Sequence, residues 1–115
     1  MIKSEHLEQT EFVSWFRKNY YPKHQIFAIP NGGLRNASQA NALKCEGVCA
    51  GVPDLFIPSL RVFIEMKKEE GGSVSKEQMQ WLNYLESVGY TVRVCKGFEK
   101  AKDFILTIMG ETENA

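Results

Sequence analysis

The sequence lacks the features that mark membrane, secreted and polycationic proteins. No apolar run approaches the roughly 20 residues that a membrane-spanning helix needs, and the polar N-terminus lacks the apolar stretch of a signal peptide. The cysteines, only Cys45, Cys49 and Cys95, form an odd set without a second Cys/His pair at zinc-finger spacing. Acidic and basic residues number 14 each, which argues against a nonspecific polycation that coats nucleic acid. We therefore expect a cytoplasmic protein.

The composition is that of an ordinary globular protein. The chain has 115 residues, of which 43% are hydrophobic and 24% charged, enough to bury a core without disulfides or structural metals. No internal repeat or second compositional region divides it. We expect one domain over residues 1–115, with residues 110–115 as a polar, frayed tail.

The first 20 residues predict an amphipathic helix with Ser4 as its N-cap. Its apolar stripe at 100° per residue consists of Phe12, Val13, Phe16 and Tyr20. Glu5 and Gln9 fall on the same stripe, and Glu8 falls at its margin. A carboxylate on the buried side of a helix is unusual, because a charge there needs a partner.

Alternating strand and helix patterns fill the rest of the chain. We expect strands at residues 25–29, 54–57, 61–67 and 90–95, and helices at 36–46, 76–88 and 98–109. The second and third of these strands are joined so closely that they predict a hairpin. The order α-β-α-β-β-α-β-α predicts an α/β fold in which helices flank a mixed sheet.

Two of the expected helices carry apolar faces that point to the core. In the helix at 36–46 the inward residues are expected to be Ala37, Ala40 and Leu43, with Ala42 beside them. In the helix at 76–88 the apolar face consists of Trp81, Leu82, Leu85 and Val88. Gln78 lies on that second face, where an unpaired amide is costly.

The densest chemical signal lies on the predicted hairpin. Asp54 follows Pro53 at the start of one strand, and Glu65 and Lys67 share one face of the other because side chains alternate along a strand. Two converging carboxylates form an oxygen-rich site for a hard cation such as Mg²⁺ or Mn²⁺. The alternative is a solvated strand face with a weak ion pair.

A metal beside a lysine suits the hydrolysis of phosphodiester bonds. The cation polarises the phosphate and lowers the pKa of a bound water. Lys67 can orient that water or stabilise the charge that builds on the phosphate oxygens. Carboxylates alone would repel a phosphate, so the reaction needs both the metal and the lysine.

At this point the sequence resembles the PD-(D/E)xK nuclease superfamily and, within it, the stand-alone VRR-NUC proteins of bacteria and phages. Pro53-Asp54 followed by Glu65-Met66-Lys67 fits the superfamily pattern. Further similar segments are residues 4–9, 28–33, 44–48, 50–55 and 75–78. The resemblance implies a restriction-endonuclease-like core and cleavage of DNA with Mg²⁺ or Mn²⁺.

The resemblance also implies roles for single residues. Asp54, Glu65 and the backbone carbonyl of Met66 would bind the metal, and Lys67 would be the catalytic lysine. Gln78 matches a catalytic-site glutamine; its alternative is a half-buried side chain bonded to backbone.

A further metal ligand is implied on the first helix. Glu5 matches the family's helix glutamate, with Glu8 as the alternative ligand. The competing interpretation of Glu5 is a frayed, solvated first turn.

Substrate and assembly are expected from the same resemblance. Small stand-alone members resemble Holliday-junction resolvases, so we expect a homodimer that cuts branched DNA. The alternatives are a structure-nonspecific or restriction-like nuclease, a non-catalytic DNA-binding subunit, or an interaction domain. Candidate DNA contacts are Asn31, Arg35, Lys44, Lys68 and Lys76.

Overall fold

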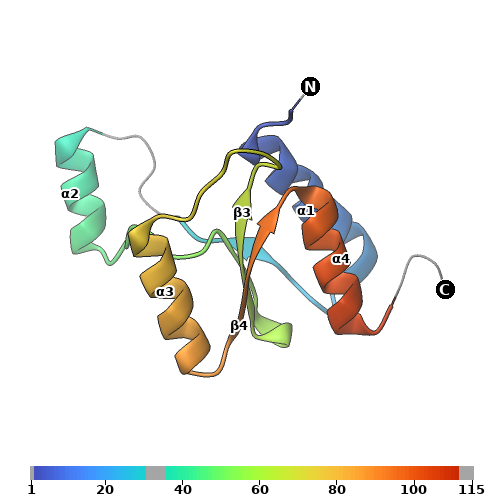
Figure 1. Cartoon of the computed structure of the whole chain (residues 1–115). Coiled ribbons are helices and arrows are strands. Elements are labelled where there is room, and N and C mark those ends of the chain that lie inside the picture. Colours follow the sequence, from blue (N-terminus) through green and yellow to red (C-terminus); the bar gives the residue numbers. More distant parts are fainter. Residues whose placement is uncertain (1, 31–35, 112–115) are drawn as a thin grey trace.

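A computed structural model describes residues 2–30 and 36–111 (Figure 1). Along the chain the elements are α1 (Glu5–Tyr20), β1 (Phe27–Ala28), α2 (Ala37–Cys45), β2 (Leu55–Ile57), a 3-10 turn (Pro58–Leu60), β3 (Val62–Lys67), α3 (Lys76–Ser87), β4 (Thr91–Lys96) and α4 (Phe98–Met109). None of the helices in these residues is long and apolar enough to cross a membrane. Residues 112–115 of the expected tail lie outside the described part.

The strands form one mixed sheet in the order β1-β2-β3-β4. The expected hairpin is confirmed, because β2 and β3 pair antiparallel with Leu55 opposite Ile64. β3 and β4 pair in parallel, while β1 adds an antiparallel edge. β1 is only two residues long and exposed, so the strand expected at 25–29 is wrong in extent. The mixed α/β architecture is confirmed.

Helices α1 and α4 cover one face of the sheet, and α3 covers the other (Figure 1). The core lies mainly under α1 and α4, where Phe12 and Phe16 meet Ile64 and Ile105, all four fully buried. At about 25 cal/mol per Å² of apolar surface, side chains of this size each contribute about 2–3 kcal/mol. β3 lies between the two helix layers, and this packing on both faces fixes its position.

The face under α3 is more aromatic and less tightly closed. Phe56, Phe63 and Tyr90 contact one another there, with ring centroids of Phe56 and Phe63 4.2 Å apart. Leu82 and Leu85 of α3 are buried as expected. Val88 was expected on the same face but is 47% exposed, because the helix has ended at Ser87.

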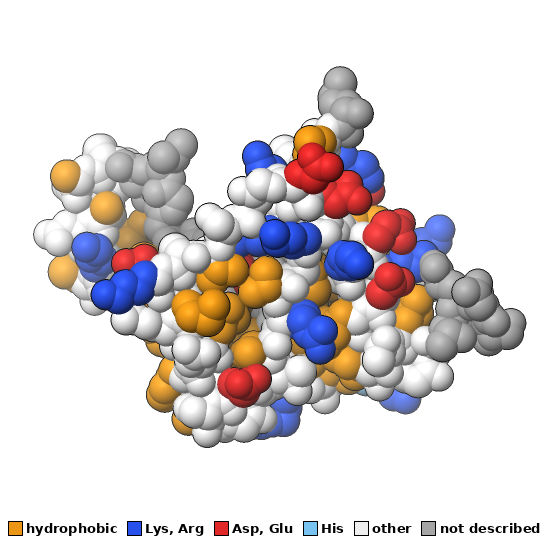
Figure 2. All heavy atoms as spheres, viewed as in Figure 1, with side chains coloured by type: hydrophobic (Ala, Val, Ile, Leu, Met, Phe, Trp, Pro, Cys, Tyr) orange, Lys and Arg blue, Asp and Glu red, His pale blue; other side chains and the backbone are white. Residues whose placement is uncertain are grey.

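The expected inward packing of α2 is wrong. The helix forms where predicted, with a capping box between Asn36 and Gln39, but none of its residues is buried. The apolar residues expected inside are exposed or half-buried: Ala37, Ala40, Ala42 and Leu43. Figure 2 shows apolar side chains open on this outlying lobe. The sequence pattern could not show that α2 stands away from the core.

Candidate active site

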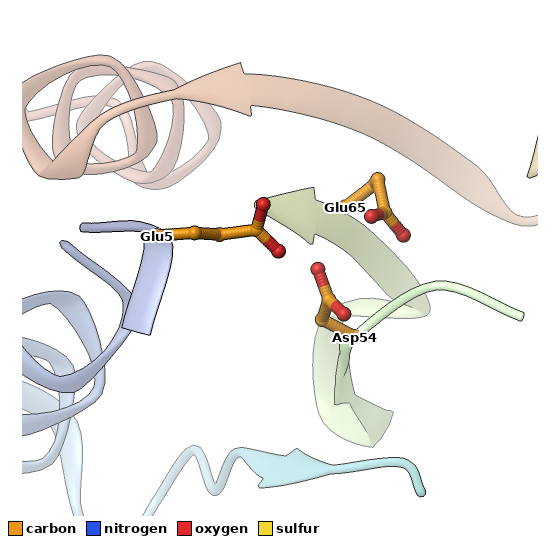
Figure 3. Close-up of side chains that lie close together, drawn as sticks. All are labelled: Glu5, Asp54 and Glu65. Atoms are coloured by element: carbon orange, nitrogen blue, oxygen red, sulfur yellow. The ribbon is translucent and has the colours of Figure 1, made fainter. Parts of the chain in front are cut away.

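Three carboxylates from separate parts of the chain converge at one end of the sheet (Figure 3). Glu5 is the first residue of α1, Asp54 directly precedes β2, and Glu65 lies on β3. One oxygen from each side chain lies within 4.8 Å of the others. The hairpin thus brings Asp54 and Glu65 together as predicted, and Glu5 joins them from the helix.

The hairpin also orients Asp54. Leu55 pairs with Ile64, which places Asp54 beside the strand end that carries Glu65. The backbone N–H of Met66 donates to Asp54 Oδ2 at 2.8 Å. This bond holds one oxygen of Asp54 and brings the Met66 main chain against the carboxyl group.

Lys67 lies on the same face of β3 as Glu65, as the alternation predicted. Its Nζ is 3.6 Å from Glu65 Oε2 and donates to Gln78 Oε1 at 3.0 Å. Lys67 is only 8% exposed, so its ammonium is confined to the site rather than free in solvent. A solvated strand face with a loose ion pair therefore does not describe these residues.

Gln78 links the other two side chains. Its Nε2 donates to Glu65 Oε2 at 3.0 Å, while its Oε1 accepts from both Lys67 Nζ and the Ser75 backbone N–H. The Ser75 bond belongs to the capping box that begins α3. Because this oxygen already accepts two hydrogen bonds, Gln78 fits a positioning residue that acts through Lys67 and Glu65.

The environment of the cluster favours protonated carboxyls when no cation is bound. Burial raises the pKa of Glu65 from its usual 4.5 to about 8, and the neighbouring Asp54 and Glu5 charges add to the effect. Burial also raises the pKa of Asp54, although the Met66 N–H opposes this. The pKa of Glu5 is raised by burial and by the Asp54 charge.

The donor set fits a divalent cation. Glu65 Oε1 is buried and has no hydrogen-bond partner among the described residues, although a buried acceptor normally has one. Asp54 and Glu65 are each held through one oxygen, which leaves the other for a ligand. A set of carboxylate oxygens matches the preference of Mg²⁺ and Mn²⁺. A cation would also neutralise the repulsion that adds to the raised pKa values of Glu65 and Glu5.

Glu8, the alternative helix ligand, lies outside this group. It is buried, 3% exposed, and its Oε1 accepts the Phe98 backbone N–H at 2.9 Å. Glu8 thus caps α4, whose N-cap Gly97 has no side chain to do so. Gly97 N–H in turn donates to the Lys67 carbonyl at 2.8 Å. Helical periodicity predicted Glu5 on the apolar stripe of α1 and Glu8 at its margin. In the structure Glu8 is buried and Glu5 is exposed.

A glycine missed by the sequence analysis supports the site from outside. A Cβ on Gly51, whose φ is +92°, would lie 2.7 Å from the Glu77 carbonyl carbon. Only glycine therefore lets the segment before Asp54 lie directly against the first turns of α3. No local signal in the sequence revealed this contact with the helix.

The predicted DNA contacts are only partly placed. Lys68 and Lys76 are exposed and flank the site, because Lys68 follows β3 and Lys76 begins α3. Lys44 is exposed on α2. Asn31 and Arg35 lie outside the described residues. Figure 2 shows further basic side chains over the sheet between α3 and α4.

Comparison with known proteins places this chain in a family. The sequence profile of the VRR-NUC domain matches residues 2–99. A solved structure described as "VRR_NUC domain protein" is similar with a TM-score of 0.75, covering 94% of this chain and 92% of that chain at 24% identity. At that identity the likeness shows the fold alone, and no curated protein sequence matches. Because the profile spans most of the chain, the protein belongs to the VRR-NUC domain family and carries a nuclease domain.

Proposed function

We propose that this protein is an endonuclease that hydrolyses phosphodiester bonds in DNA with Mg²⁺ or Mn²⁺. The observation that carries the proposal is the convergence of Glu5, Asp54 and Glu65 within 4.8 Å beside a buried lysine. These three carboxylates would hold the cation, and the backbone carbonyl of Met66 is proposed as a further ligand. When bound, the cation would polarise the phosphate and lower the pKa of a coordinated water.

The protein's own groups supply orientation and charge. Gln78 holds Lys67 and Glu65 in fixed relative positions through its two ends. Lys67 keeps its ammonium at the edge of the carboxylate cluster, where it can donate to a phosphate oxygen as negative charge grows in the transition state. The surrounding burial strengthens that interaction, since the charges are poorly screened by water.

Substrate preference and assembly complete the proposal. We propose branched DNA, such as a four-way junction, as the preferred substrate and a homodimer as the active form. A two-fold dimer would present two sites to a two-fold junction. The resemblance to stand-alone VRR-NUC proteins supports both points, and the uncovered apolar residues of α2 favour a partner subunit.

Cleavage assays with a matched pair of lysine variants test the proposal. Lys67→Ala should bind DNA and lose cleavage by at least about 100-fold, as expected when a charge-stabilising donor is removed. Lys18→Ala removes an exposed lysine of α1 to which no role is assigned and should keep most of the activity. Wild-type cleavage should disappear in EDTA and return with Mg²⁺ or Mn²⁺.

The substrate panel separates the alternatives. Labelled four-way junctions, flaps and linear duplex are incubated with the protein under identical conditions. Equal cutting of all three would exclude the junction preference and favour a nonspecific or restriction-like nuclease. Binding without cleavage in any metal would indicate a non-catalytic DNA-binding subunit. A monomeric mass by light scattering at micromolar concentration would remove the homodimer.

A further inference from the structure

A long groove runs along α1 away from the carboxylate cluster. Its volume is about 670 Å³, and it begins at Glu5. The residues that line it are Glu5, His6, Gln9, Thr10, Val13, Ser14, Arg17 and Ala28. From Glu5 to Arg17 the helix rises about 18 Å, close to the rise of five base pairs of B-form DNA. The groove is therefore long enough to follow a nucleic-acid strand, not merely to hold one phosphate.

Six of the eight residues that line the groove have hydrogen-bonding side chains, and the remainder of the lining is apolar. At about 100° per residue, His6, Thr10, Val13 and Arg17 fall within an arc of about 60° on α1. In the described residues, the side chains of His6 and Ser14 make no hydrogen bond. These polar groups are thus free to meet a ligand.

Arg17 marks the end of the groove that is opposite the carboxylates. Its Nη2 donates to the Ile26 carbonyl at 3.3 Å, which directs the guanidinium, and within residues 2–30 and 36–111 its other N–H donors have no partner. Arg17 also lines a second cavity of about 370 Å³ with Tyr21, Gln25 and Ile26. Arg17 thus lines both cavities. The lining therefore changes from acidic at Glu5 to basic at Arg17.

We infer that this groove binds the sugar–phosphate backbone of the DNA strand that leads into the active site. Arg17 contacts a phosphate several nucleotides from the cleaved bond, and the hydroxyl group of Ser14 contacts the backbone between them. The Thr10 hydroxyl lines the groove but already donates to the His6 carbonyl at 2.8 Å. The inference rests on the proposed nuclease function. It adds that affinity for the substrate depends on a basic residue remote from the metal ligands.

The test compares two adjacent arginine and lysine substitutions on α1. Arg17→Ala removes the groove cation, while Lys18→Ala removes one positive charge from a residue that lines neither cavity. Binding of a labelled four-way junction is measured in EDTA, where no cleavage occurs. Arg17→Ala should raise Kd about tenfold and reduce the slope of log K against log salt by about 1. Lys18→Ala should change Kd less than twofold.

A second pair of variants keeps Arg17 in place. Ser14→Asp introduces a negative charge into the groove and should weaken binding about tenfold, whereas Asn19→Asp on the same helix should not. If wild type cuts DNA but Arg17→Ala and Ser14→Asp bind like their controls, the groove assignment fails alone. If wild type neither binds nor cuts any DNA, the proposed function and the groove fail together. A change of oligomeric state in the groove variants, with DNA affinity intact, would overturn the inference and favour a protein partner.

Discussion

The metal-free protein should lose stability as the pH rises from about 5 to 8, because Glu65 must then be ionised in surroundings that disfavour its charge. In the unfolded chain the pKa of Glu65 is near 4.5, and in the folded protein burial raises it to about 8. Between these values the unfolded state releases a proton that the folded state retains. Stability is therefore fully present below pH 4.5 and is lost as the pH rises through 8.

The size of this effect follows from the same two pKa values. Each tenfold difference in proton affinity corresponds to about 1.4 kcal/mol, so the full range from 4.5 to about 8 corresponds to about 5 kcal/mol. A domain of this size has a total stability of about 5–15 kcal/mol. Asp54 changes stability in the same direction, because burial raises its pKa as well.

Urea denaturation in EDTA at about pH 5 and pH 8, followed by circular dichroism, measures the loss. Glu65→Gln is the control, because the oxygen of its amide can still accept from Gln78 Nε2 and the amide does not titrate. Between pH 5 and pH 8 this variant should lose less than half as much stability as wild type. Mn²⁺ should stabilise wild type more at pH 8 than at pH 5, because binding then displaces fewer protons. Stability that is flat or rises with pH in EDTA would refute the reasoning.

Two further predictions concern residues that support the site from outside. Gly51→Ala should lower the free energy of unfolding, measured by urea denaturation, by at least about 2 kcal/mol more than Gly47→Ala does. Both glycines have positive φ, but only at Gly51 would a Cβ lie 2.7 Å from Glu77. Equal losses of stability in the two variants would show that the close approach is unimportant. Glu8→Ala should destabilise by about 1–3 kcal/mol by leaving the Phe98 N–H unpaired. Glu8→Gln keeps an acceptor and should lose much less, so equal melting temperatures for the two variants would contradict the capping role.

Much of the fold could be predicted because its signals are local. Ser4 caps α1 as predicted, and α3 begins at Lys76, where its helix was expected to start. The hairpin brought Asp54 to Glu65 because the strands are adjacent in sequence and the connection is short. Gln78 was singled out for its place on an apolar helix face, and the structure gives it polar partners on both sides.

The remainder depends on contacts between segments that are distant in the sequence. Glu8 is buried because α4 begins beside it, and Phe98 lies 90 residues further along the chain. Helical periodicity gives the angle of a side chain around its helix but not the identity of the neighbour at that angle. The predicted packing of α2 was wrong for the same reason, because an apolar stripe does not reveal whether any element packs against it.

Because Glu5 lies at the start of α1, formation of the first helical turn and binding of a cation at the proposed site would be coupled. Helix ends fray most easily, and this one is held by Ser4, whose Oγ accepts the Leu7 N–H at 3.1 Å. A cation held by all three carboxylates would tie this turn to the sheet. Because such a coupling is reciprocal, formation of this helical turn would increase the affinity for the cation by the same free energy by which the bound cation stabilises the turn. The Ser4 hydroxyl, which in the described residues bonds to backbone, would thereby help to set the affinity of the proposed site for its metal, and formation of the first helical turn would be part of assembling that site.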